Sequence, residues 1–170
     1  LAYKIAHSIK KLNPEETHSI EIMQYSLAII LNTLLIFMTS ALLGWITGKL
    51  EETIIVFFSL SLLRMLSGGV HFRTARACNI FSIMVCTSIP HLSSYTIDFI
   101  WLTNCLSLVI IILFAPNPDP NSQIPQRLYP VLKVLSMLIV TTNFFITSSV
   151  IGLVFLVQSL TIIPLQRRNK

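Results

Sequence analysis

Long apolar runs separated by short polar links are the dominant pattern of this 170-residue chain. The first run, 26–46, has about the 20 apolar residues that an α-helix needs to cross roughly 30 Å of hydrocarbon, and Tyr25 and Trp45 lie at its ends. Further apolar runs occupy 53–66, 80–95, 99–115, 131–148 and 150–164. The pattern predicts an all-α, polytopic membrane protein with about six transmembrane helices.

The N-terminal segment, 1–24, differs because its apolar residues recur at helical spacing among lysines. Ile5, Ile9 and Leu12 would share one helix face. This indicates an amphipathic helix lying on the membrane, and a plain solvated helix is the open alternative. Together with a helical membrane core, 26–165, and a basic tail, 166–170, this segment is expected to form a single integral-membrane domain covering 1–170.

Two of the runs are short for a span. The run 53–66 is 14 residues long and contains Arg64, so either it or the run 150–164 could be re-entrant instead of spanning. The last two runs, 131–148 and 150–164, have a very short link and predict a tight helical hairpin.

Prolines mark two further positions. Pro90 predicts a kink in the run 80–95. His91 beside it is either a second functional histidine or, in the commoner case, a histidine bonded to a carbonyl that the proline leaves free. The five prolines of 116–130 predict an extended, non-helical loop. We favour a stiff connector over a strap that contacts a substrate.

Composition and charge support the membrane assignment and restrict the topology. The chain is 54% hydrophobic and 11% charged, with a net charge of +5, which is outside the range of ordinary soluble domains. With six spans and a cytoplasmic N-terminus, eleven of the twelve Lys and Arg residues lie on the cytoplasmic side and only Lys49 lies outside. The basic residues therefore indicate topology and contact with anionic lipid, and no aromatic and basic platform for a nucleic acid is present.

The three cysteines are Cys78, Cys86 and Cys105, an odd number without a C-x-x-C pair. We therefore expect no structural disulfide, no zinc site and no cofactor.

The stretch 64–82 interrupts the apolar pattern with residues that carry chemistry. Gly68 and Gly69 should end the preceding helix. After them come His71, which can act as a general base near neutral pH, and Cys78, which can act as a nucleophile once deprotonated. Arg73 and Arg76 lie between them and would favour the thiolate.

The spacing of this pair restricts its geometry. In one straight helix, the backbones of His71 and Cys78 would be separated by ~10.5 Å, beyond hydrogen-bond reach. A dyad therefore requires His71 in the glycine-led bend and Cys78 near the start of the next helix. There the helix N-terminus would favour the thiolate and offer N–H groups to an oxyanion, and Ser82, one turn on, could donate a hydrogen bond into the site. A buried membrane cysteine beside an interfacial histidine and lipid-binding arginines is the alternative.

Arg64, the step Gly68-Gly69-Val70-His71, Cys78 and Ser82 together resemble the accessory gene regulator B (AgrB) family of bacterial quorum-sensing membrane peptidases. The resemblance extends to F-A-P-N-P-D-P at 114–120 and to the last apolar segment, 152–164, so it covers nearly the whole chain. Asn117 departs from the small residue that the family pattern leads us to expect, which affects no proposed catalytic role.

The resemblance implies a cysteine endopeptidase in the bacterial cell membrane, with both termini and the active site cytoplasmic. It would cleave the C-terminal tail of an AgrD-like autoinducer precursor peptide through a thioester on Cys78 and promote closure of a thiolactone or lactone ring. His71 and Cys78 would be catalytic, with Arg64, Gly68, Gly69 and Ser82 as supporting or substrate-binding residues. A homodimer is a further implied possibility.

Several alternatives stay open at this point. Arg64, Arg73 and Arg76 are candidates for holding acidic groups of the precursor, and the latter two equally for binding lipid. Asn79, Ser82 or a backbone carbonyl would have to orient His71. The competing function is a non-enzymatic transporter or assembly subunit in which Gly68 and Gly69 form a hinge, and a metal site at His71, Cys78 and His91 ranks below both.

Overall fold

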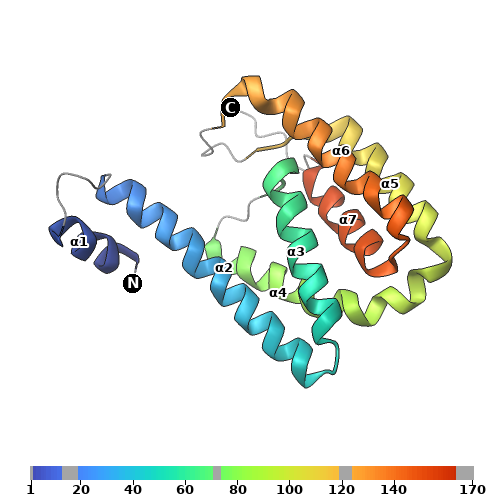
Figure 1. Cartoon of the computed structure of the whole chain (residues 1–170), viewed down its shortest axis with the longest axis horizontal. Helices are drawn as coiled ribbons and strands as arrows, with labels where there is room; N and C mark the ends of the chain where they lie inside the picture. The colour runs from blue at the N-terminus through green and yellow to red at the C-terminus, as the bar shows by residue number, and fades with distance from the viewer. Residues whose placement is uncertain (1, 13–18, 71–73, 119–123, 164–170) are drawn as a thin grey trace. The chain divides into compact units, whose positions relative to one another are not determined.

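The computed structural model describes residues 2–12, 19–70, 74–118 and 124–163 (Figure 1). These residues form seven α-helices and two short 3-10 helices, which confirms the all-α prediction. Their bounds are α1 Ala2–Leu12, α2 Ile20–Ile46, α3 Leu50–Ser67, α4 Ala75–Leu92, η1 Ser93–Phe99, α5 Ile100–Phe114, η2 Gln126–Leu128, α6 Tyr129–Ile146 and α7 Ser149–Ile162.

Contacts divide the chain into two compact units, Leu1–Thr39 and Ser40–Lys170. The first unit holds α1 and most of α2, and the second holds α3 to α7. The lysines of α1 include Lys10 and Lys11 in its last turn, where positive charge complements the helix dipole. Contact of α1 with a membrane surface stays a prediction.

Among the described residues, three helical stretches are long and apolar enough to cross a membrane: Ile20–Ile46, Arg76–Phe114 and Gln126–Ile146. The second stretch joins α4, η1 and α5, and Figure 1 shows the chain turning between α4 and α5. Helix α7 is shorter, and its 14 residues rise ~21 Å, less than the hydrocarbon thickness. Membrane spans are therefore present, and six full crossings stay a prediction.

Helix α7 lies at the centre of the second unit. It packs against α5 and α3, with smaller contacts to α4, α6 and η1, and Figure 1 shows it among α3, α5 and α6. Its apolar residues surround the whole helix, as in helices buried on all sides. Val154, Phe155 and Ile162 are buried, and so are the polar residues Gln158 and Ser159. A helix with buried polar groups at this place can hold other segments by hydrogen bonds.

The predicted hairpin of the last two runs is confirmed. Thr147 adopts the left-handed conformation, with φ 52°, at the end of α6, and the Ser148 side chain accepts a hydrogen bond from Ile151 N at the start of α7. The buried Asn143 side chain bonds both the N–H and the carbonyl of Ser148 and donates to Asn104 Oδ1 at 2.9 Å. This amide network closes the turn between α6 and α7.

One prediction about prolines needs correction. The loop 116–130 is not extended throughout, because Gln126–Leu128 form a 3-10 turn and Pro130 lies in the first turn of α6. A proline fits there because first-turn N–H groups have no partner within the helix. Pro90 lies in the last turn of α4, which ends at Leu92 and passes into η1, and the predicted kink there stays a prediction.

Candidate functional site

The predicted break after the second apolar run lies at Gly68. Helix α3 ends at Ser67, and Gly68 N donates to Arg64 O at 3.0 Å. Gly68 has φ 73° and Gly69 has φ 140°, a region that residues with a side chain rarely adopt. The two glycines therefore end α3 and turn the chain into an extended segment, Ser67 to Val70, which confirms the predicted break.

This extended segment is bound by two distant parts of the chain. Asn117 N donates to Ser67 O at 2.9 Å, and Gly69 N donates to Asn117 O at 3.0 Å. This pair of bonds makes an isolated parallel bridge between Gly68 and Asn117. Val70 N donates to Thr161 O, in the last turn of α7, at 2.8 Å. The segment that follows α5 and the end of α7 thus meet at the glycine turn.

Cys78 lies in the first turn of α4. The helix begins at Ala75 after Thr74, which has extended dihedrals and whose Oγ1 accepts a hydrogen bond from Ala77 N at 3.2 Å. This is the usual geometry of a threonine N-cap. The prediction that Cys78 lies near the start of a helix is confirmed. The positive end of the helix dipole therefore lies at the cysteine.

The charged partner of the sulfur is Arg64. Its Nη2 lies 3.6 Å from Cys78 Sγ and donates to Val70 O at 3.1 Å. Sequence reasoning assigned the charge beside the sulfur to Arg73 and Arg76. Arg76 is exposed, and Arg73 lies outside the described residues. Arg64 and Cys78 are 14 positions apart in the sequence. A reversal of the chain at Gly68 and Gly69, which the sequence predicted as a helix break, could have suggested that the two side chains meet.

Ser82 is buried one turn after Cys78, and its hydroxyl donates to Cys78 O at 3.0 Å. The hydroxyl therefore supports the backbone of α4 at the cysteine. Its predicted role as a supporting residue stays a prediction.

His71 lies outside the described residues, so the distance between its ring and Cys78 is not described. The predicted His71 and Cys78 dyad stays a prediction, and so does the group that would orient His71.

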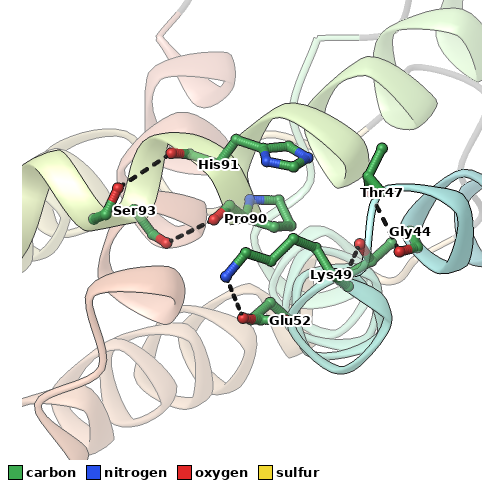
Figure 2. Close-up of polar contacts among 9 residues, drawn as sticks. Gly44, Thr47, Lys49, Glu52, Pro90, His91 and Ser93 are labelled. Carbon is green, nitrogen blue, oxygen red and sulfur yellow. Dashed lines mark hydrogen bonds and ion pairs between the residues drawn. The ribbon is translucent and has the colours of Figure 1, made fainter.

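His91 is placed away from this site. It lies in the last turn of α4, thirteen residues after Cys78 and hence ~20 Å along the helix. Figure 2 shows His91 beside Pro90, on the side where Lys49 Nζ pairs with Glu52 Oε1 at 2.9 Å. The hydrogen bond from Lys49, with the charges of Lys49 and His91, lowers the pKa of Glu52 in the polar link before the second apolar run. His91 and Cys78 cannot ligate one metal ion at this separation.

The three cysteines are free and differ in exposure. Cys78 is half-buried, Cys86 is buried and Cys105 is exposed. Within the part of the chain that the structure describes, no group of three His, Cys, Asp or Glu side chains could hold a metal ion. Cys78 is thus the cysteine that combines partial exposure, a helix N-terminus and an arginine.

The fold and the site define a helical membrane protein with several apolar spans and a cysteine at a helix N-terminus beside a glycine turn. Residues 2–165 match the family model for accessory gene regulator B. The chain belongs to this AgrB family, a family of quorum-sensing propeptide processing.

Two relatives support this assignment. The chain is 23% identical to an AgrB-like protein from Halalkalibacterium halodurans, over 97% of this chain and 86% of that one. It is 28% identical to protein FsrB from Enterococcus faecalis, over 85% of this chain and 64% of that protein. No solved structure matches the chain.

Proposed function

We propose that this protein is a membrane-embedded cysteine endopeptidase that removes the C-terminal tail of an AgrD-like autoinducer precursor and promotes its cyclisation. The observation that carries the proposal is the contact of Arg64 Nη2 with Cys78 Sγ in the first turn of α4. An arginine and a helix N-terminus at one half-buried sulfur are the surroundings of a reactive cysteine, whereas Cys86 is buried, as structural cysteines are.

The proposed reaction has two steps. His71 takes the proton of Cys78, and the thiolate attacks a backbone carbonyl of the precursor. A C–S bond forms, the C–N bond to the tail breaks, and the tail leaves as an amine with the proton from His71. A cysteine or serine of the precursor then attacks the thioester, which closes a thiolactone or lactone ring and returns the Cys78 thiol.

Arg64 has two contributions in this proposal. Its guanidinium lies beside the sulfur that attacks, and its bond to Val70 O holds the guanidinium in one orientation there. The N–H groups of the first turn of α4 face the same end of the helix as the sulfur, and such groups can stabilise an oxyanion. Because Cys78 is half-buried, less water reaches the thioester. This favours attack by the cysteine or serine of the precursor itself over hydrolysis.

We further propose that the site faces the cytoplasm. The bonds of Asn117 with Ser67, Gly69 and Ile162 bring the C-terminal ends of α3, α5 and α7 together. Arg64, Arg76 and Arg127 belong to this end, whereas Lys49 precedes α3 at its other end. This distribution supports cytoplasmic placement of the site by the positive-inside rule, and cytoplasmic termini stay a prediction. A single integral-membrane domain over 1–170 and a homodimer stay predictions.

The experiment is mass spectrometry of a cognate precursor incubated with the purified protein in lipid. We expect tail loss with wild type, no turnover with Cys78→Ala or His71→Ala, and at least a tenfold lower rate with Arg64→Gln. Cys105→Ala is the matched control, because this exposed cysteine on α5 should be dispensable. A trapped acyl adduct on Cys78 would identify the nucleophile.

Two outcomes contradict the proposal. Processing that persists in Cys78→Ala would exclude this cysteine as the nucleophile. A wild-type protein that binds its precursor and leaves it intact would favour the competing function, a membrane transporter or assembly subunit.

A further inference from the structure

Gln158 is a fully buried amide in the last part of the central helix α7. Its exposed fraction is 0%. Burial of an amide in apolar surroundings is unfavourable unless hydrogen bonds replace those to water. Gln158 Nε2 donates to Gly68 O at 2.7 Å and approaches Ser67 Oγ at 3.3 Å. Its Oε1 has no hydrogen-bond partner among the described residues, so the side chain is directed at the glycine turn by its nitrogen alone.

Gln158 completes a set of bonds that restrains successive peptide groups of the turn. Gly68 O is held by Gln158, Gly69 N by Asn117 O, and Val70 N by Thr161 O. A side chain at Gly69 would be strained at φ 140°, and Thr161 would have to shift, since the added Cβ would lie 2.8 Å from Thr161 Oγ1 and 3.3 Å from Gln158 Nε2. The backbone path to Val70 is therefore set by α7 and the segment after α5.

The Gly68 to Val70 segment is also linked to Cys78 through Arg64. Val70 O accepts the hydrogen bond from Arg64 Nη2, and that nitrogen lies 3.6 Å from Cys78 Sγ. A displaced Gly68 carbonyl would move the Val70 carbonyl two residues on. The guanidinium would then lose the acceptor that holds it beside the sulfur.

We propose that Gln158 is a positioning residue for Cys78, acting through the Gly68 to Val70 segment and Arg64. The inference rests on the proposed function for its catalytic meaning. Its physical content, the control of Cys78 reactivity from α7, can be measured without a substrate.

The first measurement is the rate of Cys78 alkylation by iodoacetamide in lipid at neutral pH, followed on the Cys78 peptide by mass spectrometry. Gln158→Met keeps the length of the side chain and removes the donor. We expect the rate to fall on the order of tenfold, as misplacement of a group near a reacting atom does. Ser159→Ala is the matched control, because this adjacent buried residue donates to Leu156 O of its own helix and should leave the rate unchanged.

A double-mutant cycle then separates positioning from general destabilisation. If Gln158 acts through Arg64, Gln158→Met should have little further effect in the Arg64→Gln protein. Equal fold-changes in both backgrounds would overturn the inference, and so would an unchanged rate in a folded Gln158→Met protein. Gln158→Asn, whose shorter amide withdraws from Gly68, replaces Gln158→Met if the latter does not fold.

Turnover distinguishes this inference from the proposed function. With a cognate precursor, we expect Gln158→Met to lower kcat and leave KM unchanged, because no bond to the precursor is removed. If alkylation responds as expected and wild type does not process precursor, the proposed function fails and the positioning role stands. If wild type processes precursor and the Gln158 variants match it, the positioning role fails alone.

Discussion

Gly68 and Gly48 have nearly the same φ in different surroundings. Their φ values are 73° and 70°. A Cβ at Gly48 would meet nothing within 4 Å, whereas one at Gly68 would overlap the Asn117 carbonyl. The requirement for glycine at position 68 is thus both conformational and steric, and it comes from a segment about fifty residues further along the chain.

The first residue-scale prediction compares alanine at these two glycines. Gly48→Ala should lower the free energy of unfolding by about 1 kcal/mol through backbone strain alone. Gly68→Ala should lower the free energy of unfolding by about 1–3 kcal/mol more than this, because its Cβ overpacks against Asn117. It should also abolish precursor processing. Thermal unfolding in detergent and the processing assay measure both effects. Equal stability and activity of the two variants would show that the bridge between Gly68 and Asn117 is not formed.

At the scale of the element, the start of α4 combines a cap with the proposed nucleophile. Thr74 accepts from Ala77 N, and Cys78 lies in the same first turn. Ser148 caps α7 in the same way, at the end of the second unit where no part of the candidate site lies. The two caps therefore form a natural pair for separating stability from reactivity.

We predict that Thr74→Ala and Ser148→Ala each destabilise the protein by about 1 kcal/mol, since each removes one N-cap hydrogen bond. Only Thr74→Ala should also slow Cys78 alkylation and precursor processing, because fraying of the first turn moves the sulfur from the helix terminus and from Arg64. Thr74→Ser should restore both rates. A similar loss of activity in Ser148→Ala would indicate that reactivity follows overall stability.

For the whole molecule, the arrangement of charge and helix ends bears on orientation in the membrane. Lys49 precedes α3, and Arg127 lies in η2 just before α6. The hydrogen-bonded ends of α3, α5 and α7 and the start of α6 belong to the end of the second unit that holds Cys78. The proposed topology puts Arg127 inside the cell and Lys49 outside.

The whole-molecule prediction uses a membrane-impermeant maleimide on intact bacteria. Lys49→Cys should be modified in intact cells, whereas Arg127→Cys should be modified only after permeabilisation, with adducts assigned by mass spectrometry. The maleimide labelling of Cys105, an exposed cysteine on α5 in the membrane part of the chain, is measured in the same cells for comparison. The reverse labelling pattern would invert the topology and remove the cytoplasmic placement of the site.

The sequence by itself determined the features that depend on neighbouring residues. Hydropathy along the chain predicted the all-α class and the apolar runs, because a helix in lipid satisfies its backbone groups within one segment. Gly68 and Gly69 predicted the end of a helix, and the position of Cys78 after them predicted a cysteine near a helix start. Pro130 was placed wrongly in the loop, since a proline suits both a loop and the first turn of a helix, and local sequence does not choose between them.

Only the tertiary structure decided which groups surround the sulfur. Arg64 was predicted to be a supporting or substrate-binding residue and lies against Cys78 Sγ, while Gln158 was not singled out although it bonds Gly68 O from 90 residues away. Asn117, noted only as a departure from a family pattern, forms the bridge to Gly68. The physical reason is that hydrogen bonds between distant segments depend on how helices pack, and buried polar groups such as Gln158 take the partners that packing brings within reach.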